Sequence, residues 1–203
     1  MSRPLQPAPA PRLPGDLAIW FIILIEMATF GLLFATFAVV RAQNLALFEA
    51  SQGLLDARRG ALNTWLLIGG SGCVVLAVRA VGAGARPAGV GWLLAAQGCG
   101  LAFLVLKGDE YARKLSAGID IETNVFFTLY YILTGFHFFH VVAAMAFLAW
   151  LTLQTGRGRY GPGKVHALET GAAFWHMVDL LWIVLFPLVY ILGDIVSEVY
   201  GFT

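Results

Sequence analysis

Five long, continuously apolar stretches divide this 203-residue sequence and constrain its fold more than any other feature. A helix that crosses the hydrocarbon core of a bilayer needs roughly 20 mainly apolar residues, and each stretch reaches that length. Transmembrane strands would alternate polar and apolar residues in segments of about ten, whereas these runs are continuous. The sequence therefore predicts an all-α, polytopic membrane protein, a bundle of five transmembrane helices over about residues 16–40, 61–81, 88–110, 122–154 and 166–196.

The composition excludes the main soluble classes. Apolar residues (A, V, I, L, M, F, W, Y, C) make up 59% of the chain and charged residues 12%, and the mean hydropathy is +0.78. A water-soluble fold of this size cannot bury so much apolar surface. The net charge of +1 excludes the basic footprint of a nucleic-acid-binding protein. The two cysteines cannot form a disulfide framework.

The segments outside the predicted spans are short. Residues 1–15 hold five of the eight prolines and are expected to form an extended tail rather than a signal peptide. Residues 16–203 are then one transmembrane domain. The longest connection, residues 41–60, is expected to be a single loop. Lysine and arginine are slightly more numerous on the N-terminal side of the predicted spans, which favours a cytoplasmic N-terminus.

Ionisable residues inside a membrane span are costly and need a partner or a function. Glu26 lies about 15 Å into the first predicted span at 1.5 Å per residue. Two further pairs, His137 with His140 and His176 with Asp179, are each three residues apart, so the members of each pair share a helix face. Counted along the helices, the carboxyls and imidazoles reach similar depths. We therefore expect a buried polar cluster in which Glu26 and Asp179 hydrogen-bond to imidazoles.

Three roles are open for this polar cluster. The side chains could join the helices through hydrogen bonds worth about 0.6–2 kcal/mol each. Glu26 could be a proton-linked carboxyl beside a pathway. Alternatively, His140 and His176 could hold one haem between the last two spans. The chain has only four histidines and no CxxC or CxxCH motif, so the sequence predicts no metal site.

A second charged group lies at the end of the third predicted span, in the sequence KGDEYARK. Lys107, Glu110 and Tyr111 are expected to form an anchor at the membrane interface. In such an anchor the lysine extends to the lipid headgroups and the tyrosine lies at their level. Contact with a partner subunit is the alternative.

Three sequence blocks resemble the haem–copper oxidase subunit III family, the third subunit of cytochrome c oxidase and its relatives. They are WFIILIEMATFGLLFATF, which resembles the family helix with an intramembrane carboxyl; FFTLYYILTGFHFFHVVAA, which resembles the TGxHxxHV segment; and LETGAAFWHMVDLLWIVLFPLVYILG, which resembles the E(x)5WHFVDxVW segment. A KxxEY motif also looks like the family. The residues on these family positions are Glu26, Lys107, Glu110, Tyr111, Thr134, Gly135, His137, His140, Val141, Glu169, Trp175, His176, Asp179 and Trp182.

The resemblance implies an accessory subunit of the five-helix bacterial form, whereas the mitochondrial form has seven helices. Such a subunit holds no haem or metal, packs against a catalytic subunit that holds both, and supports the stability and proton uptake of that subunit. Bound phospholipid and a location in the bacterial inner membrane are also implied. The position of Glu26 is the family's carbodiimide-reactive carboxyl. The residues expected to contact a partner or the membrane interface are Lys107, Glu110, Tyr111, Glu169 and Trp175.

The identity of the catalytic partner is a finer expectation. Residues 48–80, with the GDLAIWFIIL start, resemble most closely the E-type accessory protein of bacterial nitric oxide reductases. We therefore expect the nitric oxide reductase of denitrification as partner, with an aerobic terminal oxidase (cytochrome c or quinol oxidase) as the alternative. Two other functional classes stay open: a free-standing haem-b electron carrier, and a small transporter or proton channel built around Glu26.

Overall fold

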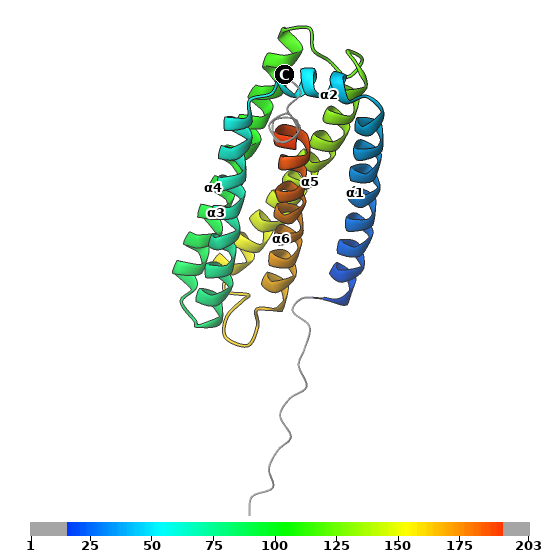
Figure 1. The fold of residues 1–203 in the computed structure, drawn as a ribbon. Helices are drawn as coiled ribbons and strands as arrows, with labels where there is room; N and C mark the ends of the chain where they lie inside the picture. The colour runs from blue at the N-terminus through cyan, green and yellow to red at the C-terminus, as the bar shows by residue number, and fades with distance from the viewer. Residues whose placement is uncertain (1–15, 193–203) are drawn as a thin grey trace, which may run out of the picture.

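The computed structural model describes residues 16–192 as a bundle of helices joined by short connections (Figure 1). Five helices are long and apolar enough to cross a membrane, which confirms the predicted all-α bundle. They are α1 (Leu17–Gln43), α3 (Ala57–Gly82), α4 (Arg86–Ser116), α5 (Val125–Gly156), and α6 (His166–Phe186), which a π-helical turn, η1 (Pro187–Ile191), continues. The predicted tail, residues 1–15, and the end of the fifth predicted span, residues 193–196, lie outside the described residues.

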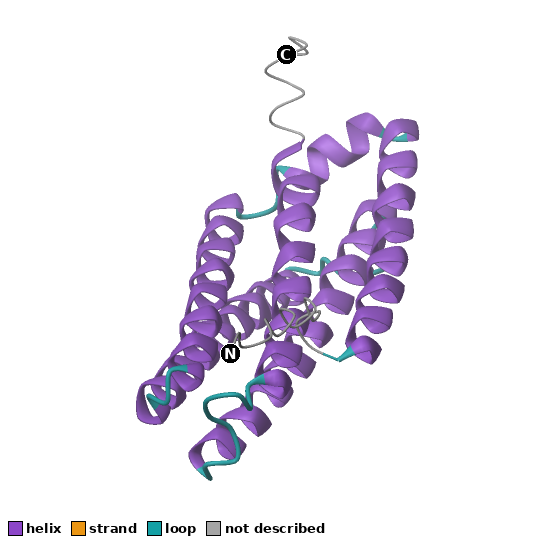
Figure 2. Cartoon of the chain, turned by 90° about the horizontal axis from the view of Figure 1, so that it is seen from below, coloured by secondary structure: helices purple, strands orange, loops and turns teal. Residues whose placement is uncertain are grey.

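The helices are packed unevenly across the bundle (Figures 1 and 2). The most extensive contact is between α3 and α4, and α5 and α6 pack against them and against each other. Helix α1 lies at the edge, with α6 and α5 as its main neighbours. Its apolar side chains are largely exposed, and its buried residues are Ile19, Phe30, Phe37 and Arg41. Lipid is therefore the expected environment for most of the α1 surface.

The connection between the first two spans contains a helix, so the prediction of a single loop over residues 41–60 is wrong. Helix α2 (Leu45–Gln52) lies across one end of the bundle (Figure 1). Phe48 of this helix is fully buried, and the centroid of its ring lies 5.2 Å from the ring centroid of Phe37 and 5.2 Å from that of Phe126. Gln52 Nε2 donates to the carbonyl of Val189 at 2.9 Å. An isolated helix of eight residues would be only marginally stable, so these tertiary contacts stabilise α2.

Local sequence signals explain where two helices begin and where α6 changes from an α-helix to a π-helical turn. The Asp56 side chain accepts from the backbone N–H of Arg59 at the start of α3, and the Asn124 side chain accepts from that of Phe127 at the start of α5. Both are N-caps that satisfy amide groups left unpaired at a helix start. Pro187 has no N–H to donate, and at this residue the α-helical pattern changes to the π-helical turn.

Two glycines allow α3 and α4 to pack closely around a tryptophan of α6. A Cβ added at Gly70 would lie 2.9 Å from Cζ2 of Trp175, and one added at Gly100 would lie 3.0 Å from its Cη2. Both distances are too short for a comfortable contact. Small residues of this kind let helices approach each other within membranes, and here they create the space that the buried indole fills.

Candidate functional site

Glu26 and His140 form the first pair of polar residues, between α1 and α5. Glu26 Oε2 lies 3.1 Å from His140 Nε2, which is ion-pair distance, although Oε2 makes no hydrogen bond of good geometry within the described residues. His140 Nδ1 lies 2.8 Å from the carbonyl oxygen of Phe136. Because a carbonyl only accepts, Nδ1 carries the hydrogen and Nε2 is left to face the carboxyl. The contact is attractive when a proton is held by one of the two partners.

The surroundings of this pair are apolar but not closed. The rings of Phe30 and Phe136 lie edge-on to the imidazole of His140, with centroids 5.4 Å and 4.6 Å away. The Glu26 side chain is 24% exposed and that of His140 is 12% exposed. Helix α1 therefore presents a carboxyl at the outer surface of the bundle, against an imidazole that can neutralise it. The predicted hydrogen bond of Glu26 to an imidazole is represented in this pair by a contact at ion-pair distance, 3.1 Å, without hydrogen-bond geometry at Oε2 among the described residues.

The other predicted pair has a different partner. His176 Nδ1 lies 2.7 Å from Oγ of Ser71 on α3, within hydrogen-bond distance. Asp179 is buried, and its Oδ1 has no hydrogen-bond partner in the part of the chain described. The predicted hydrogen bond between Asp179 and an imidazole is therefore not found among the described residues, where Nδ1 of His176 meets the Ser71 hydroxyl instead. The expected single cluster is divided into a pair on α1 and α5 and a pair on α3 and α6.

His137 lies deeper in the bundle than His140. It is fully buried, and within residues 16–192 neither ring nitrogen has a hydrogen-bond partner. The rings of Phe103 and Trp182 contact it, with centroids 5.7 Å and 5.1 Å away. His137 thus faces the interior of the bundle and His140 faces α1, although their three-residue spacing puts them on neighbouring positions of α5. Across the described chain no three His, Cys, Asp or Glu side chains are grouped to hold a metal.

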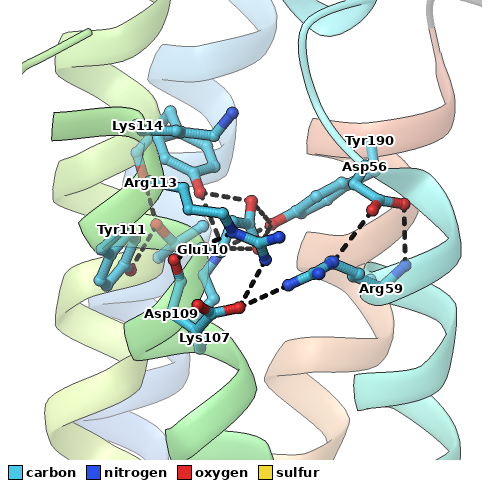
Figure 3. A network of polar contacts seen from close by, with 12 residues as sticks. Asp56, Arg59, Lys107, Asp109, Glu110, Tyr111, Arg113, Lys114 and Tyr190 are labelled. Carbon is cyan, nitrogen blue, oxygen red and sulfur yellow. Dashed lines mark hydrogen bonds and ion pairs between the residues drawn. The ribbon is translucent and has the colours of Figure 1, made fainter. Parts of the chain in front are cut away.

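Lys107 and Glu110 lie in a closed network inside the bundle (Figure 3). Lys107 Nζ donates to Glu110 Oε2 at 3.2 Å, to the Tyr130 hydroxyl at 3.0 Å and to the Tyr190 hydroxyl. Glu110 Oε1 in turn accepts from Tyr130 at 2.7 Å and from Tyr190 at 2.9 Å. Lys107 is 0% exposed and Glu110 4%. The predicted extension of Lys107 to the headgroups is therefore wrong, because α5 and η1 enclose its ammonium.

Aromatic rings complete the surroundings of the Lys107 ammonium. Four ring centroids lie between 4.7 and 5.7 Å from Nζ, those of Tyr111, Tyr130, Trp182 and Tyr190. Cation–π attraction at such distances is strongest where water is excluded. Sequence reasoning missed Tyr130 and Tyr190. The available signal was a hydroxyl within an apolar span, which needs a hydrogen-bond partner when buried.

The remaining residues predicted as anchors have separate environments. Tyr111 is half-buried, and its hydroxyl donates to Thr134 Oγ1 at 2.8 Å. Trp175 is 2% exposed, so its indole packs within the chain and cannot serve as an exposed anchor. Glu169 is half-buried in the first turn of α6. Its contact with a partner stays a prediction.

Comparison with known proteins shows which family this chain is similar to. The profile of the family described as "Cytochrome c oxidase subunit III" matches residues 19–194. The chain is 32% identical over 91 residues to "Probable cytochrome c oxidase subunit 3" of Mycobacterium tuberculosis, an alignment that covers 45% of each chain. It is 34% identical over 102 residues to "Cytochrome c oxidase subunit 3" of Thermostichus vulcanus, which covers 50% of this chain and 48% of that protein.

A third relative is named as two oxidase subunits in one protein. The chain is 28% identical over 183 residues to "Heme-copper oxidase subunit I+III" of Aeropyrum pernix, and the match covers 86% of this chain but 22% of that protein. The chain thus spans less than half the length of these curated relatives.

Proposed function

Because the chain belongs to the cytochrome c oxidase subunit III family, we propose that it is a non-catalytic subunit of an oxygen-reducing haem–copper oxidase, located in the bacterial inner membrane with a cytoplasmic N-terminus. The named relatives are cytochrome c oxidase subunits, which favours the oxygen-reducing complex over nitric oxide reductase. The partner would be the catalytic subunit, because the Aeropyrum pernix relative is named as subunits I and III together.

The environments of the histidines support an accessory role. Only four histidines are present in the sequence. His140 faces Glu26, His176 faces Ser71, and His137 is enclosed by aromatic rings. In this role the haem and metal belong to the catalytic subunit, and this chain contributes helix surface, bound phospholipid and a carboxyl.

The Glu26–His140 contact is the observation that carries the mechanistic part of this proposal. A carboxyl and an imidazole 3.1 Å apart can hold a proton between them, and both side chains are partly exposed at the bundle surface. An ionisable residue in a membrane span marks a functional position by default. We place Glu26 at the surface that supports proton handling by the catalytic subunit.

Deletion of the gene, with complementation by the full chain, tests the proposal. We expect oxygen consumption by isolated membranes to fall, while the haem spectrum of the catalytic subunit remains and nitric oxide reduction is unchanged. A tagged full-length chain should co-purify with a large haem-containing subunit. Purification of the tagged chain alone, with its own stoichiometric Soret band, would contradict the proposal and indicate a haem-b carrier.

A nitric oxide reductase accessory subunit is the second candidate. Residues 48–80 favour it through their resemblance to the E-type protein. In that case deletion lowers nitric oxide reduction and leaves oxygen consumption intact, so the same two assays separate the candidates.

A further inference from the structure

Three polar side chains, Ser71, His176 and Asp179, lie between α3 and α6, and we call them the α3–α6 seam. Ser71 Oγ lies 2.7 Å from His176 Nδ1. The same hydroxyl acts on the Asp179 carboxyl, and the imidazole acts on that carboxyl electrostatically. Asp179 takes part in none of the ion pairs within residues 16–192. Its side chain is 8% exposed, and Oδ1 has no hydrogen-bond partner among these residues.

The side chains of the α3–α6 seam have more hydrogen-bond acceptors than hydrogens. With Asp179 ionised, the hydrogens are one on the Ser71 hydroxyl and one on the neutral imidazole of His176, whereas the carboxylate alone has two accepting oxygens. If the hydroxyl donates to Asp179, Nδ1 donates to the hydroxyl and Nε2 is left as an acceptor. If the hydroxyl donates to Nδ1, the carboxylate receives no hydrogen from it. In both arrangements the seam needs a hydrogen-bond donor from outside.

The depth of the α3–α6 seam decides where that donor can come from. At 1.5 Å per residue, Ser71 lies about 21 Å and about 17 Å from the two ends of α3, and Asp179 lies about 20 Å from the start of α6. The hydrocarbon core of a bilayer is about 30 Å thick, so the seam lies near its middle, beyond the reach of headgroups. Acyl chains have no hydrogen-bond donors, and the core holds no water to replace them. The donor must therefore come from another membrane-spanning protein segment.

The surface around the α3–α6 seam is suited to cover by another helix. Ser71 and His176 are half-buried, so the seam can be reached from outside the bundle. Four apolar side chains, each between 37% and 48% exposed, flank it: Ile68 and Val75 on α3, and Leu180 and Ile183 on α6. Helix α6 packs against α3 on one side and α1 on the other (Figure 1). Hydrogen bonds between polar side chains join helices within membranes.

We propose that the α3–α6 seam is a docking surface for a transmembrane helix of the catalytic subunit, which presents a hydrogen-bond donor to Asp179. The donor is a hydroxyl, amide or ammonium group, because Oδ1 of a carboxylate only accepts. The choice of partner rests on the proposed function, whereas the choice of surface rests on the seam. A second copy of this chain suits the surface less well. A two-fold interface brings the same patch of both copies together, so two acceptor-rich seams would face each other.

Binding of the labelled full-length chain to the catalytic subunit, purified in detergent from the deletion strain, tests the surface. Asp179→Leu removes the acceptor, and we expect the dissociation constant to rise about threefold to tenfold, the effect of one hydrogen bond between membrane helices. Val75→Trp keeps the seam but adds bulk on the exposed face one turn from Ser71, and it should weaken binding as well. Val105→Trp is the matched control, because Val105 is 61% exposed on α4. It should bind like the wild type.

The wild type separates failure of this surface from failure of the proposed function. If the wild-type chain does not bind the catalytic subunit, the proposed function fails and the docking surface fails with it. If the wild type binds and both Asp179→Leu and Val75→Trp bind equally well, the surface alone is overturned. Equal weakening by Val75→Trp and Val105→Trp would also overturn it, because the effect would not depend on the face. If Val75→Trp instead dissociates an oligomer of this chain and leaves binding to the catalytic subunit unchanged, a second copy covers the seam and the proposal fails.

Discussion

Neutralising Glu110 should destabilise the bundle far more than neutralising Asp109, one residue earlier on the same helix. Glu110→Gln preserves the side-chain shape but removes the anion that faces Lys107, whose ammonium is 0% exposed. Removing one partner of a buried ion pair costs about 3–5 kcal/mol of unfolding free energy, because the other charge stays buried without compensation. Asp109 is 52% exposed and bonds Arg59 and Arg113. Exposed pairs of this kind are worth about 0–1 kcal/mol.

A double-mutant cycle isolates the pair itself. Lys107→Met should cost about 3–5 kcal/mol by the same reasoning, since it leaves the Glu110 carboxylate buried with tyrosine donors alone. The double variant Lys107→Met/Glu110→Gln has no uncompensated charge, so its cost should fall below the sum of the two single costs by about 3 kcal/mol. Additive costs would show that the two side chains do not interact.

The measurement is the free energy of unfolding in mixed micelles, titrated with sodium dodecyl sulfate and followed by tryptophan fluorescence and circular dichroism. The four variants are compared with the wild type under one lipid and salt condition. If Glu110→Gln costs no more than Asp109→Asn, the Lys107 ammonium reaches solvent or headgroups, and the enclosed network is refuted.

Three further outcomes follow from other parts of the bundle. Glu26→Gln should assemble normally but lose carbodiimide labelling, and peptide mapping that finds the label on another carboxyl would contradict the assignment. Gly70→Leu should cost about 1–3 kcal/mol of unfolding free energy through overpacking against Trp175, measured by the same titration, and an unchanged midpoint would contradict the close approach. Trp182→Phe removes the 3.0 Å hydrogen bond from Nε1 to Thr64 Oγ1 and should cost about 1 kcal/mol; a Thr64→Val background should abolish most of that difference.

Sequence reasoning located the spans and one polar contact because both depend on distance along a helix. Apolar length alone predicts a span, and all five are present. Counting 1.5 Å per residue gave Glu26 and His140 similar depths, and the two side chains meet. Depth does not give rotation about the helix axis, however. For that reason the counting could not show that Nδ1 of His176 faces Ser71 and that Oδ1 of Asp179 has no hydrogen-bond partner within residues 16–192.

The burial of Lys107 could not be predicted because it depends on elements far apart in the sequence. Its network joins α4 to Tyr130 on α5 and to Tyr190 on η1, 23 and 83 residues away. The π-helical turn at Pro187 changes the register in which Tyr190 faces the bundle. From the sequence, a lysine followed by acidic residues at the end of a span is equally compatible with an interfacial anchor.

Side-chain exposure separates four residues on the family positions into a buried pair and a partly exposed pair. Lys107 and Glu110 have side chains no more than 5% exposed and satisfied partners, so substitutions there act on the stability of the bundle. Glu26 and His140 are 24% and 12% exposed on the thinly packed α1 side, where a neighbouring subunit or lipid can reach them. Under the proposed function, a loss of oxidase activity on substitution of Lys107 would therefore be accompanied by loss of the subunit from the membrane. The same loss on substitution of Glu26, with the subunit retained, would instead locate the functional contact on α1.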